Sequence, residues 1–465
     1  MCVAAQQYKR SVALPASIEQ AFAYHDRRGA LGRLIPPWEH VTIQRSDNSL
    51  EPGSEVILKT KLGPVGMRWH ARHEIYEPPN RFTDIQVSGP FASWHHEHRF
   101  EPGPTAASSQ MHDTVDYRLP GGAVGSFFGS GKITKMLESM FAYRHRTTHD
   151  DLQMFSDHDP SPLRIAVSGS TGLVGGSFCN VANLLGHQTV PLLRGERPAS
   201  RNDQEQADVL FPWSESFVSD AFAGTDAVVH LAGKPIADKR WNAKIKQEII
   251  DSRVVPTRTL CEQLASMPKP PKVLVCASAI GIYGDRGDER LSEDSPHGDG
   301  FLADVGEQWE AACQPAADAG IRVVNLRIGI AISPQGGALQ KLLLPAKLGV
   351  NGPVADGKQW WSWVALDDVI GAIYHAIKTP DLSGPVNVVA PHAVTCGQFA
   401  RDLGSVLHRP AFLPAPAPLM RLALGEMADA LLIASTHVLP TKLQASGYRF
   451  RFEHLQDCLR HVLGK

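Results

Sequence analysis

A glycine-rich loop that directly follows an apolar segment restricts the fold of this chain more than any other sequence feature. Gly169, Gly172 and Gly175 follow the apolar segment 163–167 at three-residue spacing, and a helical pattern continues to about residue 185. In dinucleotide-binding folds the first glycine allows a tight turn, the second lets the backbone approach the pyrophosphate, and the third lets helix and strand pack closely. Free N–H groups at the helix start attract phosphate oxygens. We therefore predict a dinucleotide site at this loop.

The chain beyond the loop alternates apolar strands with helical segments. Further strands are expected at 188–193, 225–233 and 272–277. Apolar strands that alternate with helices indicate an α/β fold with a doubly wound parallel sheet of the Rossmann type. Because ligands bind at the carboxyl ends of such strands, the last residues of two strands join the predicted site. The predicted cofactor contacts are Gly169, Ser170, Thr171, Gly172, Leu173, Val174, Gly175, Leu231, Ala232, Gly233, Ala277 and Ser278.

The segment 191–197, at the end of the second strand, bears on the choice of cofactor. An NAD site commonly has an acidic residue about 20 residues after the loop, where it binds the ribose hydroxyls. This segment instead carries Arg194, whose guanidinium can face a 2′-phosphate and stack on adenine. We predict NADP as the preferred cofactor and Arg194 as a further contact. Because Glu196 is acidic, NAD is the alternative cofactor. The alternative interpretation of Arg194 is a solvent-exposed loop residue without a role in binding.

Residues 1–155 have a different pattern. A strand expected at 8–14 is followed by a helix that starts near Pro15 and Ser17, and then by six segments of alternating apolar and polar residues between residues 41 and 118. This alternation predicts an antiparallel meander. A long helix is expected at about 133–155. Since a curved sheet wrapped on a long helix usually encloses an apolar cavity, we expect a hydrophobic ligand in this part.

The segment 156–162 separates the two patterns. Its sequence, Ser-Asp-His-Asp-Pro-Ser-Pro, cannot continue a helix or enter a sheet. We predict a ligand-binding domain at 1–155, a linker at 156–162, a dinucleotide-binding domain at 163–385, and a C-terminal extension at 386–465 that packs on a substrate lobe.

Short motifs in the N-terminal part carry a resemblance to a known class of domain. They are Leu-Pro-Ala at 14–16, Ala-Phe at 21–22, Pro-Pro-Trp at 36–38 and the strand 94–100, together with the long last helix. In these features the first 150 residues or so resemble START-like domains of the SRPBCC type. The resemblance implies an α+β helix-grip fold that binds hydrophobic ligands.

The part after residue 163 resembles a family of enzymes. The matching segments, besides the glycine loop, are His-Leu-Ala-Gly at 230–233, Asp-Lys-Arg-Trp at 238–241, Asp-Ser-Arg at 251–253, 277–287, 326–329, 360–368 and 439–450. They resemble the NAD-dependent epimerase/dehydratase family, which are extended short-chain dehydrogenase/reductases. Within it they are most similar to a bacterial subgroup labelled nucleoside-diphosphate-sugar epimerase, or SulA family. The resemblance implies NAD(P)-dependent oxidoreductase or isomerase chemistry.

The catalytic residues of that family are only partly recognisable here. They comprise a serine or threonine, a tyrosine, and a lysine four residues later that lowers the tyrosine pKa, so that the tyrosine moves a proton while nicotinamide exchanges a hydride. The serine position falls on Ala279, beside Ser278, and the segment 301–310 has neither the tyrosine nor the lysine. We predict that the standard triad is absent. Ser278 and Tyr283 remain as candidate catalytic residues. The alternative for Ser278 is that it caps a loop, and the alternative for Tyr283 is a structural role at the end of the strand.

Three further residues are candidates for substrate binding. Arg327, Trp361 and Trp363 lie in the region that forms the substrate lobe in this family. A guanidinium and aromatic rings suit a sugar, a nucleotide or another flat ligand, and core positions are the alternative for the tryptophans.

His96 and His98 share one face of an expected strand. Two histidines supply too few ligands for a metal ion, and no partner is visible in the sequence. We therefore predict that they pair with polar groups of the sheet and that the chain has no metal site.

Charge and cysteine content limit partners and compartment. The chain has 46 Lys and Arg against 48 Asp and Glu among 465 residues, and a formal net charge of -2, so no overall field attracts nucleic acid or an acidic membrane. Seven scattered cysteines without a CxxC pair fit a reducing compartment. With no signal peptide and no long apolar run, we predict a cytoplasmic protein without nucleic-acid or membrane partners, and leave an oligomer open.

Together these features predict an NAD(P)-dependent oxidoreductase or epimerase-like enzyme. Its substrate would be a small carbonyl compound or a nucleotide sugar, and its N-terminal domain would bind a hydrophobic ligand. The alternative is a non-catalytic dinucleotide-binding sensor or scaffold, which the missing tyrosine and lysine favour.

Overall fold

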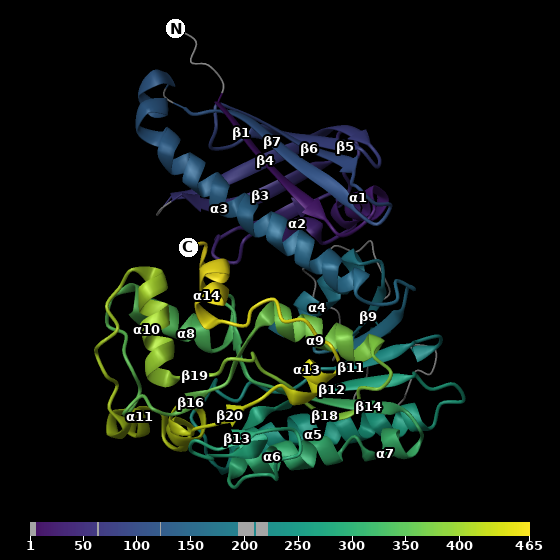
Figure 1. Ribbon diagram of the computed structural model, residues 1–465, viewed down its shortest axis with the longest axis vertical. Coiled ribbons are helices and arrows are strands. Elements are labelled where there is room, and N and C mark those ends of the chain that lie inside the picture. The colour runs from purple at the N-terminus through teal and green to yellow at the C-terminus, as the bar shows by residue number, and fades with distance from the viewer. Residues whose placement is uncertain (1–5, 63–64, 121, 194–208, 211–221) are drawn as a thin grey trace. The chain divides into compact units, whose positions relative to one another are not determined.

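The computed structural model describes residues 6–62, 65–120, 122–193, 209–210 and 222–465 (Figure 1). The chain forms two compact units. Unit 1 comprises Met1–Ser161, Asn180–Gly186 and His461–Gly464, and unit 2 comprises the other residues. Each unit is built on one large sheet (Figure 1).

Unit 1 contains a seven-stranded antiparallel sheet in the order β1-β7-β6-β5-β4-β3-β2. Its strands are β1 (Gln6–Leu14), β2 (Thr42–Ser46), β3 (Glu55–Leu62), β4 (Val65–Glu77), β5 (Arg81–Ser88), β6 (Ser93–Pro102) and β7 (Ser109–Arg118). Its helices are α1 (Ile18–Asp26), α2 (Ala30–Leu34) and α3 (Gly122–Ser156). Ser17 caps α1, where its side chain accepts a hydrogen bond from the N–H of Gln20. The predicted meander and its two flanking helices are confirmed.

The long helix α3 lies across one face of this sheet (Figure 1). Leu137 and Phe141 of the helix pack with Trp94, Val115 and Tyr117 of the strands. Alternation of side chains explains this core, because every second residue of β7 from Ser109 to Tyr117 is buried. The buried stripe includes one charged residue, Asp113, among apolar neighbours. The expected ligand cavity between helix and sheet stays a prediction.

Unit 2 contains a seven-stranded parallel sheet in the order β10-β9-β8-β11-β12-β14-β18. Its strands are β8 (Arg164–Ser168), β9 (Gln188–Leu193), β10 (Val209–Leu210), β11 (Ala227–His230), β12 (Val273–Ala279), β14 (Arg322–Ile328) and β18 (Gly384–Val388). The helices that accompany them are α4 (Leu173–Leu184), α5 (Ala243–Ala265), α6 (Phe301–Ala311), α7 (Gln314–Asp318) and α9 (Leu366–Lys378). The predicted doubly wound parallel sheet is confirmed.

The strand order reverses direction between β8 and β11. From β8 the chain first adds β9 and β10 on one side, and then β11, β12, β14 and β18 on the other. In open α/β sheets this reversal leaves a crevice at the carboxyl ends of the two central strands. The glycine loop follows β8, so the topology brings it to this crevice together with the residues after β11.

The C-terminal part adds short strands and helices to unit 2. Pairs of short strands are β13 (Arg290–Leu291) with β20 (His437–Val438), β15 (Ile330–Ile332) with β17 (Trp363–Ala365), and β16 (Trp360–Trp361) with β19 (Val394–Thr395). The remaining helices are η2 (Ile280–Tyr283), α8 (Gly337–Lys347), α10 (Cys396–Leu407), α11 (Ala417–Leu424), α12 (Glu426–Ala428), η3 (Asp429–Ile433), α13 (Thr441–Ala445) and α14 (Leu455–Leu463). Within the described residues, no helix has both the length and the hydrophobicity to cross a membrane.

The last strand of the parallel sheet lies across the predicted boundary between residues 385 and 386. β18 pairs with β14 from Gly384 to Val388, so residues from both sides of that boundary belong to one strand. We propose that the boundary of the dinucleotide-binding domain follows Val388.

Candidate functional site

The glycine loop has a backbone that only glycine fits at two of its three positions. Gly169 has a φ of +72°, and a Cβ there would lie 2.8 Å from the carbonyl carbon of Leu231. A Cβ at Gly175 would lie 2.3 Å from the carbonyl oxygen of Gly169. Gly172 donates its N–H to that same oxygen at 2.9 Å and is itself exposed. The first and third glycines therefore close the turn, and the second leaves its outer side open for a ligand.

Ser170 gives this loop a second indication of a ligand. Its hydroxyl is buried and has no hydrogen-bond partner. Buried polar atoms are rarely left unpaired in native proteins. The loop lies at the start of α4, where N–H groups have no helical acceptor. A phosphate group would supply acceptors to the hydroxyl and the N–H groups alike, so these residues fit the pyrophosphate of a dinucleotide.

Residues 231–233 follow β11 on the other side of the crevice. Leu231 donates its N–H to the carbonyl oxygen of Ser168 at 3.2 Å, which ties the end of β11 to β8. Gly233 lies beside the Arg253 guanidinium, whose Nη2 donates to the carbonyl oxygen of Lys234 at 2.9 Å. Burial lowers the pKa of Arg253 to about 10. Arg253, which the sequence marked only as part of a family motif, thus fixes the turn after β11.

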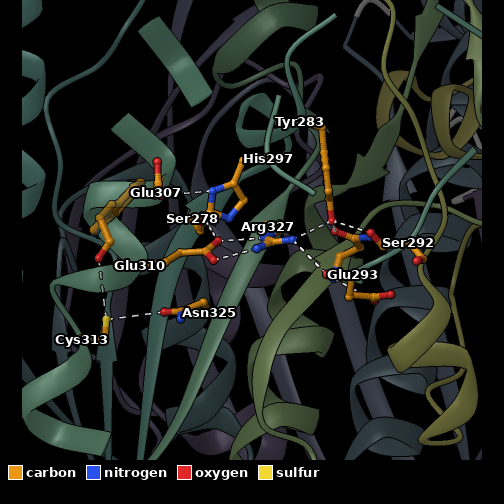
Figure 2. A network of polar contacts seen from close by, with 12 residues as sticks. Ser278, Tyr283, Ser292, Glu293, His297, Glu307, Glu310, Cys313, Asn325 and Arg327 are labelled. Atoms are coloured by element: carbon orange, nitrogen blue, oxygen red, sulfur yellow. Dashed lines mark hydrogen bonds and ion pairs between the residues drawn. The ribbon is translucent and has the colours of Figure 1, made fainter. Parts of the chain in front are cut away.

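Three side chains that the sequence singled out meet around one carboxylate (Figure 2). Ser278, at the end of β12, donates its hydroxyl hydrogen to Glu310 Oε1 at 2.6 Å. Arg327 of β14 donates from Nε and Nη2 to the two oxygens of Glu310, both at 2.8 Å. Its Nη1 also donates to the hydroxyl oxygen of Tyr283 at 2.9 Å. Glu310 of α6, which was not among the predicted site residues, therefore links Ser278 to Arg327 and through it to Tyr283.

The side chains linked through Glu310 are buried and form hydrogen bonds with other groups of the protein. Tyr283 is fully buried, and Ser278 and Arg327 are each 3% exposed. The Tyr283 hydroxyl lies 2.7 Å from Asn387 Oδ1 and 3.0 Å from the carbonyl oxygen of Ser292. Burial raises the pKa of Tyr283, against the opposing effect of the Arg327 charge. These contacts favour the structural interpretation of Tyr283 and hold all three Arg327 nitrogens in contacts inside the protein.

The face of α6 that lies on η2 is closely packed. A Cβ at Gly281 would lie 3.2 Å from Leu302 Cβ, and a Cβ at Gly306 would lie 2.9 Å from Ile282 Cβ. Leu302 and Gly306 are four residues apart, which is the spacing of the tyrosine and lysine in the resembled family. A side chain at position 306 would collide with Ile282, so this face as packed has no room for a lysine there.

The two tryptophans predicted to contact a substrate lie in the core. Trp363 has no exposed surface and donates its ring N–H to the carbonyl oxygen of His392 at 2.9 Å. Trp361 is 6% exposed, and its ring packs on Phe399. Aromatic side chains in this arrangement stabilise the short strands β16 and β17. This burial favours the core alternative for Trp361 and Trp363, and their contact with a substrate stays a prediction.

Arg194 and Glu196 lie outside the described residues. The preference for NADP therefore stays a prediction from the sequence. The other predicted cofactor contacts lie in the loop after β8, in the first turn of α4, or at the ends of β11 and β12. These segments belong to three neighbouring strands of the sheet.

Three family models match successive stretches of the chain. Residues 14–141 match "Polyketide cyclase / dehydrase and lipid transport", and residues 165–390 match "NAD dependent epimerase/dehydratase family". Residues 415–462 match a domain of unknown function. The first two matches correspond to the START-like and epimerase resemblances that the sequence motifs carry.

Individual proteins are similar over one or both parts. An epimerase family protein of Mycobacterium bovis is 35% identical over 298 residues, which are 64% of this chain and 97% of that protein. The crystal structure of a nucleoside-diphosphate sugar epimerase from Corynebacterium glutamicum is 32% identical, with a TM-score of 0.78 over 98% of this chain and 90% of that one. The human epimerase family protein SDR39U1, solved with NADPH, is 30% identical, with a TM-score of 0.58 over 65% of this chain and 99% of that one. This chain therefore belongs to the NAD-dependent epimerase/dehydratase family.

Proposed function

We propose that unit 2 binds NADP(H) at the crevice between β8 and β11 and uses it on a small carbonyl compound or nucleotide sugar. The observation that carries this proposal is the glycine loop, in which Gly172 is exposed and the buried hydroxyl of Ser170 has no hydrogen-bond partner. The human relative solved with NADPH supports NADP over NAD, and Arg194 is the residue that we propose to read the 2′-phosphate.

Each part of the proposed site has a separate task. Residues 170–174 would bind the pyrophosphate through N–H groups and the Ser170 hydroxyl, while Gly172 lets the backbone come close. Leu231–Gly233 and Ala277–Ser278 would line the ribose and nicotinamide. When bound, the nicotinamide supplies or accepts a hydride.

Proton transfer in this site cannot follow the usual pattern of the family. We propose that the tyrosine and lysine are replaced by Leu302 and Gly306, since these residues have the required spacing on α6 and face η2. Ser278 is the hydroxyl residue that we place beside the ribose and nicotinamide. Its hydrogen bond to Glu310 makes Glu310 a positioning residue for Ser278.

The same observations favour a second candidate function. The hydroxyls of Ser278 and Tyr283 are engaged inside the protein, and α6 offers neither tyrosine nor lysine. A protein that binds the dinucleotide without turnover, as a sensor or scaffold, would need nothing more than the loop. For unit 1 we propose that the domain matched as polyketide cyclase and lipid transport binds a hydrophobic ligand.

The test is calorimetric titration of the full chain with NADPH, NADP⁺, NADH and NAD⁺. We expect NADPH to bind, Gly172→Val to weaken it at least tenfold, and Arg194→Ala to weaken NADPH but not NADH. Gly131→Val is the matched control, because a Cβ at this exposed position in α3 meets nothing within 4 Å. If no dinucleotide binds, or if Gly172→Val binds like the control, the proposed site is wrong.

Turnover then separates the two candidates. Purified protein that binds NADPH is assayed for NADPH oxidation with ketones and quinones. With nucleotide sugars the sugar products are analysed by chromatography, because an epimerisation returns the hydride and consumes no net cofactor. Turnover that is lost in Ser278→Ala supports the enzyme, whereas binding without turnover on the whole panel supports the sensor.

A further inference from the structure

Unit 1 contains a buried group of histidines and carboxylates on three neighbouring strands. Asp84 of β5 stands directly opposite His96 of β6, and His98 of β6 stands directly opposite Asp113 of β7. Antiparallel register therefore brings four side chains with ligand atoms to one face of the sheet. His145 of α3 reaches the same place and contacts Asp113.

The ligand atoms in this group are close together. His96 Nδ1 lies 3.3 Å from Asp84 Oδ1, and His96 Nε2 lies 3.1 Å from Asp113 Oδ1. One ligand atom each from Asp84, His96 and His98 lie within 4.8 Å of one another. Ligands bound at about 2.1 Å around a tetrahedral zinc ion are roughly 3.4 Å apart, so closing by up to about 1.4 Å would bring these three atoms to a shared ion.

Asp113 pairs with one ring nitrogen of each histidine. Its Oδ1 lies 2.6 Å from His98 Nδ1 and 3.1 Å from His96 Nε2. The side chains of His96 and Asp113 are 4% and 1% exposed. The second ring nitrogen of each histidine is therefore the one that remains for a metal ion.

We propose that Asp84, His96 and His98 bind a divalent transition-metal ion, of which zinc is the best chemical match. Two imidazoles and a carboxylate are a set that zinc and its neighbours in the first row accept. Metal-bound histidines commonly give their second ring nitrogen to a carboxylate. Asp113 has this role for His96 through Nε2, which leaves Nδ1 on the side of Asp84. Three protein ligands leave a coordination position for water or for an oxygen of a ligand.

The site is independent of the dinucleotide crevice, since all four residues lie in unit 1. It replaces the expectation of no metal site, which rested on His96 and His98 alone. Asp84 could not be counted from the sequence because it is 12 residues away on another strand, and only the pairing of β5 with β6 brings it opposite His96.

The experiment measures zinc in the full chain. Protein is treated with a chelator, dialysed, and titrated with Zn²⁺ by calorimetry; Co²⁺ absorption reports the coordination. We expect one zinc per chain at this site, at least 100-fold weaker binding in Asp84→Asn and His98→Ala, and 10- to 100-fold weaker binding in Asp113→Asn. His95→Ala is the matched control, because His95 is the adjacent residue of β6 and points to the opposite face.

Two outcomes would overturn the proposal. One is a protein that takes up neither Zn²⁺ nor Co²⁺, and the other is binding that Asp84→Asn and His98→Ala leave unchanged. His392, Glu453 and His454 form an exposed group of possible ligands in unit 2, so loss of the bound zinc in His392→Ala would assign it there instead. Asp84→Asn keeps the side-chain volume, and circular dichroism checks that each variant is folded.

Discussion

Arg327 and Glu310 form a two-point ion pair in the interior of unit 2, with Nε and Nη2 of the guanidinium each 2.8 Å from a carboxylate oxygen. The Arg327 side chain is 4% exposed and that of Glu310 is 14% exposed. The pair joins β14 to α6 and, through Ser278, to the end of β12. It therefore holds together the elements that form one side of the proposed cofactor crevice.

Removing Glu310 would leave a buried guanidinium without its partner. We expect Glu310→Ala to lower the free energy of unfolding by about 3 kcal/mol, the usual cost of an uncompensated buried charge. Glu307→Ala is the control, since Glu307 lies one turn earlier on α6 with its side chain 63% exposed, and it should change stability by less than about 0.5 kcal/mol. Urea unfolding followed by tryptophan fluorescence measures both. Equal midpoints for the two variants would contradict the role given to this pair.

The substitution Gly306→Ala tests how closely the face of α6 packs on η2. Alanine normally stabilises an exposed helix position occupied by glycine by about 0.5–1 kcal/mol. At Gly306 the added Cβ would lie 2.9 Å from Ile282 Cβ, so we expect Gly306→Ala to destabilise by roughly 1–3 kcal/mol instead. Gly131→Ala, with open space around its Cβ, should be neutral or stabilising. Thermal unfolding of the two variants gives the sign, and a stabilised Gly306→Ala would show that this face has room for a side chain.

Local features of the sequence were enough to predict the folds of both parts. The glycine loop could be predicted because its turn and its helix start depend on residues between Gly169 and Gly175. The meander of unit 1 could be predicted because each strand carries its own alternation, as β7 does from Ser109 to Tyr117.

Long-range contacts could not be predicted in the same way. Glu310 was missed because its partners Ser278 and Arg327 come from two strands, 32 and 17 residues away. The burial of the Trp363 ring could not be predicted either, because the sequence does not say which way a ring points. The predicted domain boundary at 385/386 fell inside β18, since the pairing of this strand with β14 is a property of the sheet.

His230 predicts how the stability of unit 2 depends on pH. It is fully buried between Ser168 Oγ at 2.7 Å and Thr257 Oγ1 at 3.0 Å, and burial lowers its pKa from 6.5 to about 4. The folded protein therefore holds His230 neutral, while the unfolded chain binds a proton below pH 6.5. Stability is complete above that pH and falls as the pH drops toward 4, by up to roughly 3 kcal/mol from this residue. The unfolding midpoint of His230→Gln, compared with the unmodified chain at pH 7.5 and 4.5, should depend less on pH. The same pH dependence in both proteins would exclude His230 as its source.

Asp368 provides the last prediction, because it joins α9 to the C-terminal segment. Its carboxylate is fully buried and accepts hydrogen bonds from the backbone N–H of Arg451 at 2.8 Å, from that of Phe452 at 3.2 Å and from the Tyr448 hydroxyl at 3.0 Å. Asp368→Ala removes the acceptor that these three donors share, while the Tyr448 hydroxyl keeps the backbone oxygen of Asp368 at 3.1 Å. Loss of a buried hydrogen bond costs about 1–3 kcal/mol.

We therefore expect Asp368→Ala to lower the melting temperature and to raise hydrogen exchange at Arg451 and Phe452 before the rest of unit 2. Asp457→Ala removes an exposed pair with Arg460, whose side chains are 56% and 49% exposed, and should leave both measurements unchanged because such pairs contribute about 0–1 kcal/mol. Exchange at residues 451 and 452 that stays as slow in Asp368→Ala as in Asp457→Ala would mean that other contacts hold the segment, and that Asp368 does not anchor it to α9.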